Sequence, residues 1–384
     1  MKKIFATLLL VAMLLSCLPL AAFAEEGSTA TPDLGITAKS AVLMEAQTGK
    51  ILYAKNESES LPPASVTKVM TLLLTMEAIR DGKITWNDTV TVSEHAAEMG
   101  GSQIFLEAGE SMSVTDMVKS VVIASANDAA VALAEHIAGS EEAFVSAMNR
   151  RALELGMVST HFENTNGLDD SVENHVTSAK DIAIMSRALI AFPEILEFSS
   201  TWMDTVRDGA FTLTNTNRLV RFYPGATGLK TGSTAKAKFC ISATAERGGV
   251  SLIAVIMGAE SRDIRNAEAK KLLDYGFAHY GVYRDEGGVL DPIAVRGGMA
   301  ETVSLSAKPF QCVLPKEKIS SVVRELTLPE VVDAPVKAGD KVGEIRYTLD
   351  GALLGTADIV AEEASDAISY LELLHRLLCA FTLT

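Results

Sequence analysis

The chain has 384 residues, 48% of them hydrophobic, and its 49 acidic residues against 34 basic ones give a formal net charge of −15 at pH 7. This acidic balance excludes the basic footprint that nucleic-acid binding requires, so no nucleic-acid partner is expected. The length exceeds what a single hydrophobic core usually organises, which predicts two domains.

Residues 1–24 have the pattern of an export signal. Two lysines precede an apolar run from Ile4 to Leu20, and Ala22-Phe-Ala24 offers a cleavage site of small residues. We therefore predict a signal peptide at 1–24 and an exported mature chain. A membrane-spanning segment and a lipidated Cys17 are alternatives, but the apolar run is short for a span and continues past the cysteine.

The next segments indicate a hairpin followed by helices. Two apolar-rich runs flank Thr48-Gly49-Lys50 and predict a β-hairpin. After Pro62-Pro63, apolar residues recur every three or four positions, which indicates a helix that ends near Gly82. Ser113 and Ser178 each stand three positions before an aspartate, so we expect them to cap two further helices.

From Phe211 onward the pattern favours strands, with a hairpin about Gly248-Gly249 and then a helix that closes a first domain at 25–282. Beyond it, short β-rich runs broken by proline and glycine predict a small β domain at 283–360.

The tail at 361–384 is helical in pattern, with a narrow polar stripe. It is too polar to span a bilayer and too apolar for a solvated helix, so we predict a membrane-surface anchor. Packing onto the β domain is the alternative.

Three short motifs carry the chemistry: Ser65-Val-Thr-Lys68, Ser125-Ala-Asn127 and Lys230-Thr-Gly-Ser233. Together they supply a serine nucleophile, a lysine one helical turn away, and a polar and cationic wall for a carboxylate-bearing substrate. One motif alone is weak, because a second S-x-x-K, Ser233-Thr-Ala-Lys236, also occurs. The order and separation of all three predict acyl transfer to serine.

The motifs and their flanks, PPASVTKVMTLLLTMEA, IASANDAAVALAEHIAG and GLKTGSTAKAKFCISATAE, closely resemble the low-molecular-mass penicillin-binding serine D-alanyl-D-alanine carboxypeptidases. The resemblance runs from about Ile36 to Val360. It implies an α+β catalytic domain of the serine β-lactamase and transpeptidase type, with an antiparallel sheet flanked by helices, followed by a small all-β domain. It also implies removal of the terminal D-alanine from peptidoglycan pentapeptide stems, covalent inhibition by β-lactam antibiotics, and a place at the outer face of the cytoplasmic membrane.

We predict three catalytic residues. Ser65, at a helix start where the dipole favours a developing alkoxide, is the nucleophile. Lys68 is its base and must be neutral, so burial and repulsion from Lys230 should lower its pKa. Ser125, at a break between two helices, would relay a proton to the leaving amine. In the alternative interpretation both residues have a purely structural role, with Ser65 as a helix cap and Lys68 as a surface residue.

Five residues are predicted to bind substrate. Asn127 would hydrogen-bond the peptide of the substrate, although it could instead cap the following helix. Lys230 and Thr231, on a strand, would hold the terminal carboxylate, with Lys230 staying cationic, and Gly232 would allow close backbone approach. The resemblance implies that the backbone N–H groups of Ser233 and of the nucleophile form the oxyanion hole.

No metal or cofactor is expected, because the six histidines show no metal-ligand spacing. A serine β-lactamase is one rival, but Glu163-x-x-Asn166 is one residue short of the class A spacing. A catalytically silent wall sensor or scaffold is the other.

The chain departs from the family pattern in two places. Where relatives often have histidine before Gly167, this chain has Asn166. The arginine that helps bind the carboxylate in some relatives has no clean match here, and Arg218 and Arg221 stay unassigned.

Overall fold

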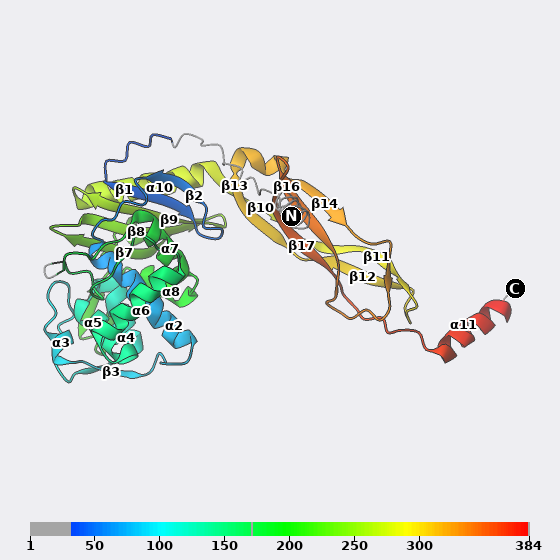
Figure 1. Cartoon of the computed structure of the whole chain (residues 1–384), viewed down its shortest axis with the longest axis horizontal. Coiled ribbons are helices and arrows are strands. Elements are labelled where there is room, and N and C mark those ends of the chain that lie inside the picture. The colour runs from blue at the N-terminus through cyan, green and yellow to red at the C-terminus, as the bar shows by residue number, and fades with distance from the viewer. Residues whose placement is uncertain (1–31, 170–171, 383–384) are drawn as a thin grey trace, which may run out of the picture. The chain divides into compact units, whose positions relative to one another are not determined.

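The computed structural model describes residues 32–169 and 172–382, so the predicted signal peptide at 1–24 lies outside the described residues. The first domain is built on an antiparallel sheet of five strands in the order β2-β1-β9-β8-β7 (Figure 1). The strands are β1 (Ser40–Glu45), β2 (Ile51–Lys55), β7 (Ala226–Thr234), β8 (Lys238–Arg247) and β9 (Val250–Ala259). Both predicted hairpins, β1–β2 and β8–β9, are confirmed.

The sheet separates two hydrophobic cores because successive side chains of a strand point to opposite faces. In β1, Ala41 and Leu43 pack in the core formed with helix α10 (Arg262–His279), whereas Val42 and Met44 belong to the larger core on the helical side. Figure 1 shows α10 on one face of the sheet and the labelled helices of residues 68–199 on the other.

The helical layer lies between β2 and β7 in the sequence, together with two small hairpins. Its helices are η1 (Ala64–Thr67), α2 (Lys68–Arg80), α3 (Glu94–Ala97), α4 (Val114–Lys119), η2 (Ser120–Ala124), α5 (Asn127–Ala138), α6 (Glu141–Glu154), α7 (Ala179–Ile190), α8 (Pro193–Ser199) and α9 (Leu219–Phe222). The hairpins pair β3 (Thr89–Thr91) with β4 (Ser111–Ser113) and β5 (Met203–Val206) with β6 (Phe211–Thr214).

The local signals of the sequence explain where these helices begin. Ser113 and Ser178 cap α4 and α7 by accepting hydrogen bonds from the N–H groups three residues on, as predicted. The helix expected after Pro62-Pro63 is divided: a 3₁₀ turn, η1, contains Ser65, and the α-helix begins only at Lys68. The nucleophile candidate thus lies in the turn that leads into α2.

The C-terminal region is all-β apart from η3 (Lys316–Ser321) and the tail helix. Its strands are β10 (Tyr280–Asp285), β11 (Gly288–Arg296), β12 (Thr302–Ala307), β13 (Phe310–Pro315), β14 (Val323–Thr327), β15 (Val331–Asp333), β16 (Lys341–Leu349) and β17 (Ala352–Ala361). Tyr347 is fully buried among them and stacks on Phe310 at a centroid distance of 4.1 Å. The tail forms α11 (Tyr370–Thr382).

Candidate active site

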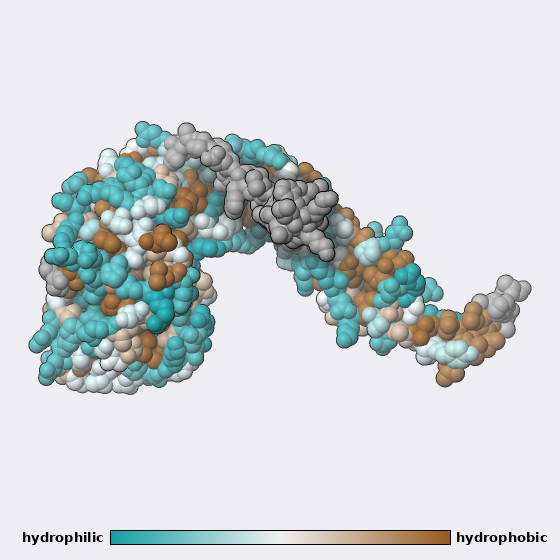
Figure 2. Space-filling model, viewed as in Figure 1, coloured by the Kyte–Doolittle hydropathy of each residue, from teal (hydrophilic) through white to brown (hydrophobic). Residues whose placement is uncertain are grey.

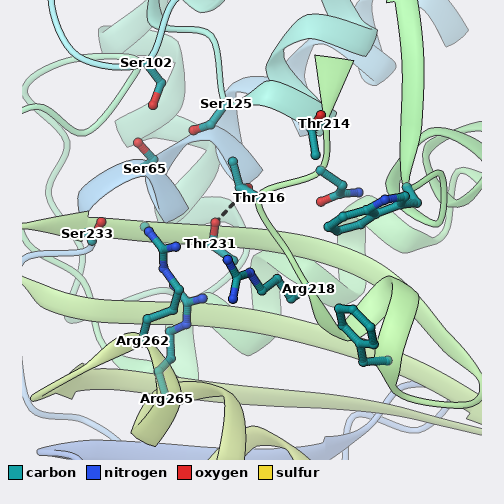
Figure 3. Close-up of a pocket in the computed structure, with 14 residues that line it drawn as sticks. Ser65, Ser102, Ser125, Thr214, Thr216, Arg218, Thr231, Ser233, Arg262 and Arg265 are labelled. Atoms are coloured by element: carbon teal, nitrogen blue, oxygen red, sulfur yellow. Dashed lines mark hydrogen bonds between the residues drawn. The ribbon is translucent and has the colours of Figure 1, made fainter. Parts of the chain in front are cut away.

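The three motifs, distant in sequence, line one groove of about 650 Å³ (Figure 3). Ser65 comes from η1, Ser125 from the break between η2 and α5, and Thr231, Gly232 and Ser233 from β7. Because β7 is an edge strand of the sheet, a peptide substrate can add alongside it as a further strand. The predicted residues therefore meet in a cleft suited to an extended peptide.

Lys68 is fully buried beneath the groove, and its amine has three neighbours. Nζ lies 3.0 Å from Ser65 Oγ, 2.6 Å from Asn127 Oδ1 and 2.8 Å from the carbonyl oxygen of Asn166. Burial and, to a lesser degree, the charge of Lys230 hold the pKa of Lys68 well below its usual value, with Asp128 opposing them. Lys68 is thus no surface residue, and its amine is biased towards the neutral form that a general base needs.

The neighbours of Lys68 fix the direction in which a neutral amine would face. An ammonium group has three N–H donors, whereas a neutral amine keeps two donors and gains one lone pair. The oxygens of Asn127 and Asn166 can only accept hydrogen bonds. Once Lys68 is neutral, both N–H groups serve these two carbonyl oxygens, and the lone pair is left for the hydroxyl of Ser65.

Ser125 and Lys230 form the second half of the polar centre. Ser125 ends η2 with φ of 65°, a left-handed conformation that turns the chain towards α5. Lys230 is 1% exposed and donates to Ser125 Oγ at 2.8 Å and to the carbonyl oxygen of Thr231 at 2.9 Å. Burial, followed by the charge of Arg265, lowers the pKa of Lys230 to about 7. The ammonium form of Lys230 is therefore less favoured than that of an exposed lysine, an effect of burial that the sequence does not reveal.

Asn127 connects the site to the groove wall and does not cap α5. Its Oδ1 accepts a hydrogen bond from Lys68, and its Nδ2 donates to the carbonyl oxygen of Gly100 at 2.6 Å. Its backbone N–H donates to the carbonyl oxygen of Ser102 at 2.7 Å. The residue is the first of the helix, and the N-cap position is occupied by Ala126. The amide has a second Nδ2 hydrogen with which to meet a substrate carbonyl.

Two glycines let the backbone segments of the site come close together. A Cβ on Gly232 would lie 2.9 Å from the backbone nitrogen of Ser65, so β7 could not approach η1 as closely with any other residue. Gly167 has φ of 83°, and a Cβ there would lie 1.9 Å from the carbonyl oxygen of Ala64. Close packing at both positions fixes the turn that carries Ser65.

His175 is a positioning residue that sequence reasoning missed. It is buried, and burial lowers its pKa to about 4, so the ring is neutral at physiological pH. The backbone N–H of Glu163 donates to Nδ1 at 2.9 Å, which leaves the hydrogen on Nε2 to donate to Thr67 Oγ1 at 2.7 Å. Thr67 in turn donates to the carbonyl oxygen of Ala64. The ring thereby supports the 64–67 turn from behind.

The groove wall carries a cluster of three arginines, of which the sequence indicates only Arg218 as a candidate. Arg218, Arg262 and Arg265 line the groove below Thr231 (Figure 3). Arg265 is buried, and its guanidinium is hydrogen-bonded within the protein to Asn266 Oδ1 and weakly to a carbonyl oxygen. Burial lowers its pKa to about 10, so it stays charged at neutral pH. Arg218 and Arg221 are close to the third motif in the sequence, whereas the buried Arg265 lies on α10, farther along the chain.

Two further kinds of group were considered near the site, a metal-ligand cluster and the base of a β-lactamase. Within the described ranges 32–169 and 172–382, no cluster of three or more His, Cys, Asp or Glu side chains could hold a metal ion. Glu163, the candidate base of a β-lactamase reading, accepts a hydrogen bond from the N–H of Asn174 through its side chain and does not line the groove.

Comparison with known proteins identifies the family. The D-alanyl-D-alanine carboxypeptidase family matches residues 26–261, and the C-terminal domain of penicillin-binding protein 5 matches residues 284–367. The chain belongs to the D-alanyl-D-alanine carboxypeptidase family. A family member from Bacillus subtilis, DacF, is 43% identical over 383 residues, which is 98% of this chain and 98% of the relative.

Solved structures of the family agree. Penicillin binding protein 6B of Escherichia coli has a TM-score of 0.69 at 35% identity, covering 87% of this chain and 97% of that chain. A penicillin-binding protein of Listeria monocytogenes, solved in an ampicillin-bound form, has a TM-score of 0.59 at 32% identity. The match covers 64% of this chain and 100% of that chain. The predicted fold class, a penicillin-binding catalytic domain followed by a small all-β domain, is confirmed, as is the enzyme class of serine D-alanyl-D-alanine carboxypeptidase.

Proposed function

We propose that this enzyme removes the terminal D-alanine from peptidoglycan pentapeptide stems through an acyl-enzyme on Ser65. One observation carries the proposal: the buried amine of Lys68 lies 3.0 Å from Ser65 Oγ, and its other two neighbours are obligate acceptors. This arrangement directs the lone pair of a neutral Lys68 at the hydroxyl that must lose its proton.

Acylation follows from the positions of the side chains. Lys68 takes the proton of Ser65 as Oγ attacks the carbonyl carbon of the penultimate D-alanine. The backbone N–H groups of Ser65 and Ser233 would stabilise the oxyanion. Ser125 passes its proton to the amine of the leaving D-alanine as the C–N bond breaks, and Lys230, which donates to Ser125 Oγ, replaces that proton.

The carboxylate of the leaving D-alanine needs cationic and hydroxyl partners. Lys230 and the hydroxyl of Thr231 supply two, and we add Arg265, whose buried guanidinium faces the same wall of the groove. A carboxylate bound here would also favour the protonated form of Lys230, whose pKa burial has lowered to about 7. Water then attacks the ester and its proton returns through Ser125 to Lys230, while Lys68 gives the proton back to Oγ of Ser65 as the ester bond breaks.

We also propose that β-lactam antibiotics acylate Ser65. A β-lactam presents a strained amide whose leaving amine stays attached to the acyl group. The ampicillin-bound Listeria relative supports this reading. The residual alternatives, a β-lactamase and a catalytically silent sensor, differ in what happens to the adduct and to the stem peptide.

The test of the proposed activity is mass spectrometry of a pentapeptide stem ending in D-alanyl-D-alanine after incubation with the enzyme. We expect loss of one D-alanine and a stable penicillin adduct on the peptide that contains Ser65. Rapid release of hydrolysed penicillin with an intact pentapeptide would indicate a β-lactamase. An adduct without any cleavage of the peptide would indicate a silent sensor.

The exported location is part of the proposal. The pattern of residues 1–24 supports removal of a signal peptide, and a peptidoglycan substrate lies outside the cytoplasmic membrane. We assign 25–282 to catalysis and 283–360 to the β domain, together with the residues before α11 that pair with it at Ser365 and Ala367, and we assign α11 to attachment at the outer face of the membrane. The domain limits remain predictions.

The tail supports attachment to a membrane surface. Among the described helices, none is both long and apolar enough to cross a membrane. In α11, however, large apolar side chains are exposed and form an apolar surface at the C-terminal end in Figure 2. They are Tyr370, Leu371, Leu373, Leu374, Leu377 and Leu378. An amphipathic helix of this kind lies in the membrane interface with its apolar face buried.

Removal of residues 370–384 should release the protein from membranes and leave its activity on a soluble peptide intact. The cut begins at α11 because Ser365, just before it, is 2% exposed and accepts from the N–H of Ala300, so it belongs to the β domain. Membrane fractionation of the mature full-length and shortened proteins measures the effect. The triple change Leu371→Gln, Leu374→Gln and Leu378→Gln should act like the deletion, and Glu372→Gln should not. A shortened protein that stays with the membrane contradicts the anchor.

A further inference from the structure

The active-site groove continues past the position of a leaving D-alanine. Besides the residues at Ser65 and Thr231, its lining includes Trp202, Arg218 and Phe222, whereas the side chain of alanine is a single methyl group. In the proposed reaction the attacked carbon lies at Ser65 and the leaving carboxylate at Thr231, so the groove beyond Thr231 is the leaving side. Thr216, whose hydroxyl accepts from Thr231 Oγ1 at 2.8 Å, and then Trp202 line this extension.

The extension has one aromatic wall. The rings of Trp202 and Phe222 meet edge to face with their centroids 6.3 Å apart. The guanidinium of Arg221 lies 5.4 Å from the Trp202 centroid and 5.6 Å from that of Phe222. Phe222 is 61% exposed. Such a wall can cover a chain of methylene groups.

The same extension carries more positive charge than one carboxylate needs. Arg218 and Arg262 are exposed, line the groove, and have no hydrogen-bonded or ion-pair partner for their side chains among the residues that the structure describes. Burial and then the charge of Arg262 lower the pKa of Arg265; Arg218 adds a smaller lowering, and Cys240 and Asp263 oppose these effects. Arg218 and Arg262 therefore repel Arg265, and a second bound anion would relieve this repulsion.

We propose that this extension is a subsite for a leaving D-amino acid whose long side chain ends in a carboxylate. The methylene groups contact Trp202 and Phe222, and the side-chain carboxylate binds Arg218 and Arg262. The chemistry is that of the proposed function, on which this inference rests: the D-alanyl ester of Ser65 forms, the C–N bond breaks, and the leaving amine takes a proton before water hydrolyses the ester.

A series of tripeptides tests the subsite. Each has an N-acetylated L-lysine, then D-alanine, and a terminal D-alanine, D-norleucine, D-α-aminoadipate or D-lysine, so only the leaving residue changes. We expect kcat/KM of the D-α-aminoadipate peptide to exceed that of the D-lysine peptide by about tenfold or more at low salt, and also to exceed that of the D-norleucine peptide. Added salt should reduce the preference.

The arginine variants show whether the subsite residues cause the preference. Arg218→Gln combined with Arg262→Gln should remove most of the advantage of D-α-aminoadipate over D-norleucine and leave cleavage of the D-alanine peptide nearly unchanged. Arg218→Glu should shift the preference towards D-lysine. Arg221→Gln is the matched control: this exposed arginine packs on the wall rings but does not line the groove, so acidic and neutral leaving residues should be affected alike and the ratio of their kcat/KM values should stay the same.

The outcomes separate this inference from the proposed function. If the D-alanine peptide is cleaved but D-α-aminoadipate has no advantage, or if the double variant keeps that advantage, the subsite is overturned and the carboxypeptidase activity stands. If no peptide of the series is cleaved, the proposed function fails and the subsite with it.

Discussion

Ser65→Ala should abolish both penicillin labelling and release of D-alanine, with kcat lowered by a factor on the order of 10⁴ or more. The amine of Lys68 has three hydrogen-bonded neighbours, and Ser65 is the one among them that has a hydroxyl group. The change removes this hydroxyl. Fluorescent-penicillin labelling and mass spectrometry of the proteolysed adduct measure the first effect, and a D-alanine release assay measures the second.

The loss should not arise from unfolding. Ser65 lies at the groove surface and its side chain caps no helix, since the N-cap of η1 is Pro63 and that of α2 is Thr67. Thermal unfolding of the variant should therefore match that of the parent within about 1 kcal/mol. Ser233→Ala is a suitable comparison, because it removes the hydroxyl of the second S-x-x-K and keeps the backbone N–H. Labelling of Ser65→Ala at Ser233 would contradict the assignment.

Much of this site could be predicted because acyl transfer leaves short, ordered motifs. The serine and lysine of the first motif are separated by one helical turn, and the glycine of the third lies where β7 meets η1. These constraints are local, since each follows from neighbours in sequence or from a strand that must approach a turn closely. The hairpins and helix caps were predicted for the same reason.

The remaining features depend on long-range packing that no local pattern records. His175 reaches Thr67 across more than a hundred residues, and its ring is neutral because the fold buries it. Arg265 faces the groove only because α10 packs on β8 and β9. The lowered pKa of Lys230 likewise follows from burial, which the sequence does not reveal for a lysine on a polar strand.

The pH dependence of kcat/KM should be bell-shaped and should be explained by the two buried lysines. Activity requires Lys68 neutral, so the rate rises with pH through a pKa that burial and Lys230 have lowered. It also requires Lys230 charged, so the rate falls above a pKa of about 7 in the free enzyme. The profile alone cannot assign the roles, because a charged Lys68 with a neutral Lys230 would give the same curve.

Arginine substitutions resolve this ambiguity, because arginine keeps its charge and cannot act as a base at these pH values. Lys68→Arg should therefore lose nearly all activity, by about a thousandfold or more if the general base is removed. Lys230→Arg should keep a substantial part of it, and its alkaline limb should move to higher pH, since the cation no longer titrates. Profiles of kcat/KM for both variants on one tripeptide provide the measurement, with circular dichroism as the folding control. If Lys68→Arg proves the more active of the two, Lys230 is the base and the proton path through Ser125 runs in the opposite direction. If both variants lose the same activity, their rates give no reason to assign one lysine as the base and the other as the cation, and the proposed division of roles is contradicted.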